Sequence, residues 1–317
     1  MRIARLRTER NDAYYHVVNY VAGLPGQQPF TEELRAEYIE RLKQCADFFT
    51  VEPIAFAFMP DHYHLILHDP GDELDDEEAC ERYNEYYKDR KVLFAGTPRE
   101  IKPGTPACKR AKKRMTDMAM FMRDFQQQIA HAFKSKSAWR GNLWAERYKS
   151  TILEAGTALW EAVKHVECNG ARLTGCEMPG DYAFCSWYAF SKTGKHPFQK
   201  NFVRHLKSNW PHKGKLPKKA FLEIARLDLD ETWQNRKELL EAAEASTKRK
   251  RRWLRLDQHD RVWANGFVIG SEDFVRETAA EAYPDDKAQS HQLMSMRTLK
   301  NEKLYSYRRL NKRKKIL

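Results

Sequence analysis

The most constraining feature of this chain is a pair of histidines two positions apart in an apolar stretch. Residues 54–58 read IAFAF, and residues 59–67 read MPDHYHLIL. Because a Pro-Asp turn separates the two apolar runs, this segment predicts two β-strands joined by a tight turn. Side chains at positions i and i+2 of a strand point to the same face, about 7 Å apart. We therefore expect His62 and His64 on one face of the second strand.

Two imidazoles on one face suit a divalent cation, which takes neutral ring nitrogens as ligands. The alternative is a polar sheet face that merely tolerates histidines, and His68 on the same face favours that interpretation. Short motifs also occur by chance. The spacing alone therefore leaves both interpretations open.

Composition limits the class of protein. The 317 residues are 42% hydrophobic and 12% aromatic, enough to fill a core, and the length suits two compact units or one domain with a large accessory region. No run approaches the 18 or so apolar residues of a membrane span, and residues 1–7 lack an apolar signal segment. We therefore expect a cytoplasmic protein without a membrane partner. The six cysteines show no C-x-x-C spacing, which predicts buried reduced thiols.

A net charge of +12 suits a polyanionic partner. The charge gathers in runs at residues 109–114, 248–252 and 308–315, and aromatic residues accompany two of them. Each run alone is more often a solvated surface, but three runs with nearby aromatics favour nucleic acid. The expected phosphate-binding residues of these runs are Lys109, Arg110, Lys112, Lys113, Lys248, Arg249, Arg251, Arg252, Lys312 and Arg313.

Hydrophobic periodicity predicts the order of elements in the first two thirds of the chain. The expected elements are a strand at 14–21, a helix at 32–49 with Thr31 as its N-cap, strands on either side of the Pro-Asp turn, a helix at 115–136, a strand at 147–153 and a helix at 158–168. Residues 70–113 predict a charged, exposed insertion with one helix. This order is typical of an α+β, ferredoxin-like antiparallel sheet with helices on one face. Beyond residue 196 we expect a basic, mainly helical region.

Further segments complete a recognisable pattern. They are residues 15–17 (YHV), 121–125 (FMRDF), 141–150 (GNLWAERYKS), 165–169 (HVECN) and 181–185 (DYAFC). Together with the histidine pair, residues 1–195 resemble the single-tyrosine HUH transposases, in particular their REP-associated branch. A weaker similarity lies at residues 263–275.

The resemblance implies a HUH domain over residues 1–195, a basic accessory region over 196–317, and single-stranded or hairpin DNA as partner. It also implies a divalent metal, Mg²⁺ or Mn²⁺, held by His62, His64 and Asn169. In this family, cleavage and strand transfer pass through a covalent phosphotyrosyl intermediate. The resemblance is compatible with a monomer or a homodimer, and RNA remains an alternative partner.

The chain departs from the family at the nucleophile. Relatives carry a tyrosine four residues before the third ligand, whereas this chain has His165 there. Four interpretations follow: cleavage is lost and binding kept, Tyr148 is the nucleophile, His165 attacks or acts as a base for water, or another tyrosine such as Tyr182 enters the site. The protein is then a covalent transposase-like enzyme, a cleavage-deficient nucleic-acid-binding protein, or a hydrolytic metal-dependent nuclease.

The remaining candidates surround these positions. Arg172 falls on an arginine of the family pattern, and Arg140 and Arg147 are expected to contact phosphates. Trp144 is expected either to stack on an unpaired base or to fasten a strand to the preceding helix. Glu167 is a spare metal ligand or, more simply, an exposed salt-bridge partner.

Overall fold

The computed structural model describes residues 12–23, 27–71, 74–88, 100–174, 176–210, 217–244, 262–263, 266–282, 291–297 and 303–309. Its first part contains the predicted order of elements: β1 (Ala13–Tyr20), α1 (Glu32–Phe48), β2 (Glu52–Phe58), β3 (His62–Asp69), α4 (Met118–Ser135) and β4 (Lys149–Leu153). Thr31 caps α1 by accepting a hydrogen bond from the Leu34 backbone N–H, as expected. Asp117 caps α4 in the same way.

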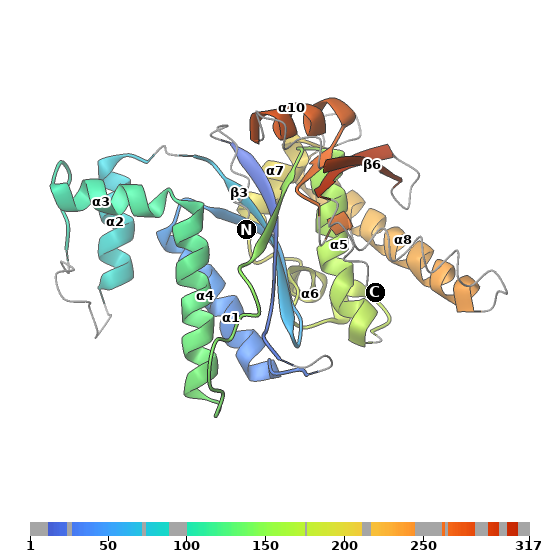
Figure 1. Cartoon of the computed structure of the whole chain (residues 1–317), viewed down its shortest axis with the longest axis horizontal. Coiled ribbons are helices and arrows are strands. Elements are labelled where there is room, and N and C mark those ends of the chain that lie inside the picture. Colours follow the sequence, from blue (N-terminus) through green and yellow to red (C-terminus); the bar gives the residue numbers. More distant parts are fainter. Residues whose placement is uncertain are drawn as a thin grey trace, which may run out of the picture.

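These four strands lie in the order β2-β3-β1-β4, and every neighbouring pair is antiparallel. This is the ferredoxin-like arrangement, so the predicted α+β fold class is confirmed. Figure 1 shows α1 and α4 together on one side of the sheet. Alternate strand residues such as Tyr15, Val17, Leu65 and Leu67 fill the core on that side.

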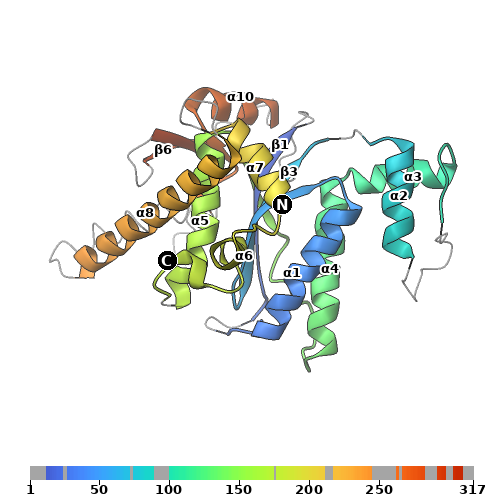
Figure 2. The ribbon, with the colours of Figure 1, turned by 180° about the vertical axis from the view of Figure 1, so that it is seen from behind.

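The opposite face of the sheet is also covered, which the sequence did not predict. α5 (Thr157–Thr174), α6 (Ser186–Thr193) and α7 (Gln199–Ser208) pack against β2, and α5 also contacts β3. A long helix, α8 (Lys218–Glu244), joins this layer (Figure 2). The second core contains Ile54, Ile66 and Leu153. These are the strand residues that alternate with those of the first core, so His62, His64 and His68 face the α5 layer.

The region after residue 196 is mainly helical in its described part, but it also adds three strands. β5 (Val268–Gly270) pairs in parallel with β4, and the hairpin of β6 (His291–Arg297) and β7 (Lys303–Arg309) continues the same sheet. α10 (Glu272–Ala282) packs on β5 and β7. Since the accessory region shares one sheet with the predicted HUH domain, a boundary at residue 195 stays a prediction.

The predicted insertion at 70–113 contains two helices rather than one, α2 (Asp76–Tyr87) and α3 (Pro106–Met115). It is not simply exposed, because Tyr83, Cys108 and Ala111 are buried in the first core. The Tyr86 ring packs against Phe48 of α1 with ring centroids 4.4 Å apart. None of the six cysteines, all in the described part, forms a disulfide, and five of them are buried. Among the described helices, none is long and apolar enough to cross a membrane.

Candidate metal centre

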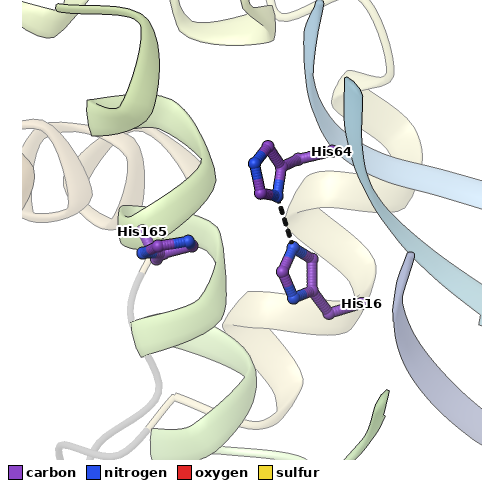
Figure 3. Close-up of side chains that lie close together, drawn as sticks. All are labelled: His16, His64 and His165. Carbon is purple, nitrogen blue, oxygen red and sulfur yellow. Dashed lines mark hydrogen bonds between the residues drawn. The ribbon is translucent and has the colours of Figure 1, made fainter. Parts of the chain in front are cut away.

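Three histidines from three elements meet between the sheet and α5. His16 on β1 and His64 on β3 project from neighbouring strands, and His165 on α5 faces them (Figure 3). One ligand nitrogen from each side chain lies within 4.8 Å of the other two. We call this group the three-histidine cluster. Its residues are 1%, 3% and 9% exposed, respectively, so an ion held there would be largely shielded from solvent.

The hydrogen bonds of His16 fix its tautomer. Its Nδ1 lies 3.0 Å from the Trp263 carbonyl oxygen, which can only accept, so Nδ1 carries the proton. The Nε2 of His16 therefore bears the lone pair, and it lies 2.9 Å from Nδ1 of His64. Burial lowers the pKa of His16 to about 4, so this imidazole is neutral at pH 7.

Trp263 also orients the third histidine. Its indole ring stacks on the His165 ring, with centroids 5.7 Å apart and planes 24° apart. His165 lies edge-on to both His16 and His64, at 5.8 and 5.6 Å between ring centroids. The same tryptophan thus contacts two members of the cluster from a fully buried position.

The predicted pair, His62 and His64, does lie together, with ring centroids 5.0 Å apart. Nδ1 of His62 donates to the Asp61 carboxylate at 2.5 Å, and this hydrogen bond lowers the pKa of Asp61. The other ring nitrogen of His62, Nε2, is then the one that bears a lone pair. Tyr20, which is 37% exposed at the end of β1, stacks on His62 at 4.8 Å between ring centroids.

Asn169, the predicted third ligand, is buried one helical turn beyond His165. A chain of contacts locates this end of α5. A Cβ on Gly170 would touch the Tyr182 ring, and the Tyr182 hydroxyl donates to the Phe58 carbonyl, beside the turn that leads to His62. Asn169 therefore lies toward the His62 end of β3, while His165 lies toward the His16 side.

Neither predicted tyrosine reaches the histidines. Tyr148 is buried in the core beneath α1 and α4, on the opposite face of the sheet, where it acts as a packed aromatic. Tyr182 accepts a hydrogen bond from Arg35 at 2.7 Å while donating to Phe58 at 2.7 Å, and burial raises its pKa to about 12. Its hydroxyl is thus committed to a structural role.

Glu167 is fully buried rather than an exposed salt-bridge partner. Its carboxylate accepts hydrogen bonds from the Ser186 hydroxyl and, at 2.9 Å, from the Trp187 backbone N–H, both in the first turn of α6. A carboxylate at a helix N-terminus satisfies backbone donors that have no partner within the helix. Glu167 therefore joins α5 to α6.

A second group lies at the other end of β3. Glu52 accepts hydrogen bonds from His68 at 2.9 Å and His205 at 2.7 Å, and it also pairs with Arg204. Burial would raise the pKa of Glu52, but these three donors outweigh it and hold that pKa far below its usual range. We call Glu52, His68 and His205 the Glu52 cluster. It has the ligand types of a metal site, but its carboxylate is already neutralised.

The predicted nucleic-acid contacts are dispersed. Lys109, Arg110 and Lys113 are exposed on α3, which projects beyond α4 on the side away from α5 (Figure 1). Lys112 pairs with Asp76 at 2.7 Å. The predicted residues that fall outside the described side chains are Arg172, Lys248, Arg249, Arg251, Arg252, Lys312 and Arg313.

Arg140 and Arg147 are exposed on the segment between α4 and β4. That segment follows the end of β1, because the Ala145 backbone N–H donates to the Tyr20 carbonyl at 3.0 Å. Trp144 is half-buried against Phe30 and Tyr63, and its indole N–H donates to a carbonyl of α4. It fastens the strand to the preceding helix, which was one of the two expectations for this residue.

His16 is the residue that the sequence reasoning missed as a site member. The motif at residues 15–17 contains it, and it is a histidine in an apolar strand. Its proximity to His64 depends on the β1–β3 register, in which His16 pairs with Ile66 and Val18 pairs with His64. That register is a long-range property that no local pattern specifies.

The chain was compared with known families, curated proteins and solved structures. No family model matches the chain, and no curated protein matches it. A solved structure described as "Structure of the REP associates tyrosine transposase bound to a REP hairpin" has 13% sequence identity and a TM-score of 0.39, over 69% of this chain and 96% of that chain. Similarity at this level does not establish a family for this protein.

Proposed function

We propose that this protein is a transposase-like protein that binds single-stranded or hairpin DNA and uses a divalent metal to assist phosphodiester cleavage. The observation that carries the proposal is the placement of His62 and His64 on the sheet face that α5 covers. His165 and Asn169, four positions apart, share one face of that helix. The HUH pattern requires a strand that carries the histidine pair to face a helix that carries a further polar ligand.

The donor set fits a divalent ion. The Asp61 carboxylate holds the proton of His62 on Nδ1, so Nε2 is available as a ligand. His62, His64 and Asn169 would supply two imidazole nitrogens and one amide oxygen, a set that suits Mn²⁺ better than the oxygen-preferring Mg²⁺. When bound, such an ion would polarise the scissile phosphate.

The DNA path that we propose runs over the end of β1. Tyr20 offers an exposed ring on which a base can stack, a contact worth about 1–3 kcal/mol. Arg147 and Arg140 lie on the neighbouring segment and would bind phosphates. The path would bring a backbone phosphate to His62.

A second candidate is a nucleic-acid-binding protein that no longer forms a covalent intermediate. The specific observation in its favour is that Tyr148 and Tyr182 are both buried in structural contacts. A hydrolytic nuclease in which His165 activates water would also leave no adduct.

One assay separates these functions. Labelled hairpin DNA is incubated with the full-length protein and Mn²⁺, and the products are resolved on denaturing gels. We expect cleaved DNA, and its loss in His62→Ala. Cleavage with a protein–DNA adduct supports covalent chemistry, and loss of the adduct in His165→Ala identifies His165 as the nucleophile. Cleavage without an adduct supports hydrolysis, whereas tight binding with intact DNA under every condition supports the second candidate.

Binding is tested separately from cleavage. Arg147→Gln and Arg140→Gln are expected to weaken hairpin binding, and each lost phosphate contact reduces the salt slope of log K by about 0.7 on single strands. Tyr20→Ala should weaken binding while Tyr20→Phe should not, since phenylalanine keeps the stacking ring. Unchanged binding in all these variants would refute the proposed path.

A further inference from the structure

We propose that His16, His64 and His165 form a site for a transition-metal ion of the zinc class, which shares only His64 with the His62, His64 and Asn169 site proposed above. Three neutral imidazoles are soft nitrogen donors, which favour Zn²⁺, Co²⁺, Ni²⁺ or Cu²⁺ over Mg²⁺. Three protein ligands also leave the fourth tetrahedral position open. His165, at the position where the transposases that the sequence resembles carry a tyrosine, would then supply a ligand.

The distances fit an ion after a small closure. Zinc–nitrogen bonds of about 2.0–2.1 Å in tetrahedral geometry place two ligand nitrogens about 3.3 Å apart. Nε2 of His16 and Nδ1 of His64 are 2.9 Å apart, and one ring nitrogen from each of the three residues lies within 4.8 Å of the other two. The distance between the His16 and His64 nitrogens would increase by a few tenths of an ångström. His165 would move inward by about 1.5 Å, a shift within reach of side-chain rotation.

The surroundings of His16 are those of a metal ligand. A ligating histidine commonly donates its other N–H to a carboxylate or a backbone carbonyl, which fixes the tautomer. His16 does this toward the Trp263 carbonyl, so its Nε2 already presents a lone pair to the cluster. Trp263 also stacks on His165 and limits the orientations of that ring.

The protons balance. Without an ion, Nδ1 of His64 donates to Nε2 of His16, which accepts. With an ion, His64 moves its proton to its own Nε2 and presents Nδ1 as a ligand. This tautomer shift keeps one proton on the His64 ring, so the step needs no proton to leave that residue.

The Glu52 cluster is the natural control. It contains two histidines and a carboxylate. That carboxylate is bound by Arg204, which an ion would have to displace. In the three-histidine cluster, His16 instead contacts the Trp263 carbonyl and His64.

The test is a titration of metal-free, full-length protein with Co²⁺, followed by the visible absorption of tetrahedral cobalt, and then competition by Zn²⁺. No DNA is present, so failure of the proposed DNA chemistry does not affect the result. We expect wild type to bind one equivalent, and His16→Gln and His165→Gln to bind more than about 100-fold more weakly, beyond the loss typical of an outer-shell change. His62→Gln and His68→Gln are expected to keep the wild-type affinity.

Three results would overturn the proposal. The first is the absence of a tetrahedral cobalt spectrum with wild type. The second is a loss of cobalt affinity in His62→Gln while His16→Gln keeps the wild-type affinity. The third is a loss of cobalt affinity in His68→Gln as large as that in His16→Gln. Circular dichroism verifies that each variant is folded. If His16→Gln does not fold, His165→Gln decides, because His165 is the most exposed of the three residues.

Discussion

Replacing Gly170 with alanine should displace α5 from the end of the sheet where His62 lies. An added Cβ would lie 2.0 Å from Cδ1 and 2.3 Å from Cγ of Tyr182, whereas ordinary contacts begin near 3.4 Å. The ring cannot move aside freely, because its hydroxyl is held by the Phe58 carbonyl and Arg35. Overpacking of about 1–3 kcal/mol and two weakened hydrogen bonds of about 1 kcal/mol each give a predicted loss of about 3–5 kcal/mol.

Urea unfolding followed by circular dichroism measures this loss, and Tyr182→Ala provides the matched background. With the ring removed, alanine no longer clashes, and its better helix propensity should make Gly170→Ala neutral or stabilising by up to about 1 kcal/mol. The sign of the effect should therefore reverse between the two backgrounds. A Gly170→Ala protein as stable as wild type would refute the packing argument.

Three further predictions concern other residues. Burial lowers the pKa of His196 to about 3 from 6.5, so the folded state resists protonation. The stability that depends on its neutral form is complete above pH 6.5 and is lost as the pH falls toward 3, by about 2 kcal/mol between pH 7 and pH 5. His196→Asn, which still offers an acceptor to the Phe198 N–H, should remove that part of the pH dependence in urea unfolding, and an unchanged pH profile would contradict it. Tyr148→Phe should leave hairpin cleavage and any adduct on denaturing gels unchanged, because this residue packs on the far face of the sheet; a lost adduct would show that it reaches the site. Zn²⁺ at 100 times its Kd should stabilise wild type by about 2.7 kcal/mol but not His165→Gln, and equal stabilisation of both in thermal unfolding would place the ion elsewhere.

Local pattern was enough to predict the first half of the fold. Alternation along residues 62–68 placed His62 and His64 on one face, and the two cores confirm it. The Thr31 cap and the spacing of apolar residues gave α1 and α4. These features depend on neighbours within a few residues, where periodicity and capping are informative.

The rest depends on pairings between distant segments. β5 has only three residues and is stabilised by β4 and β7, both more than 30 residues away, so no periodic pattern marks it. The second layer of helices was missed for a related reason. A strand that is buried on both faces appears as a continuous apolar run, and the sequence of β2 alone does not say what covers each side.

His64 connects the two proposed metal sites, and its chemistry makes them alternatives. A neutral imidazole has one lone-pair nitrogen, so His64 cannot ligate an ion beside His16 and another beside His62 at the same time. An ion held by His16 and His165 uses Nδ1 of His64, which in the metal-free protein donates to His16. An ion held with His62 and Asn169 instead leaves the bond between His16 and His64 in place if it takes Nε2. His165 thus favours coordination by Nδ1 of His64, beside His16, over coordination by His64 in the site with His62. His165→Tyr removes one of the ligands beside His16, so it should favour the site with His62 and Asn169.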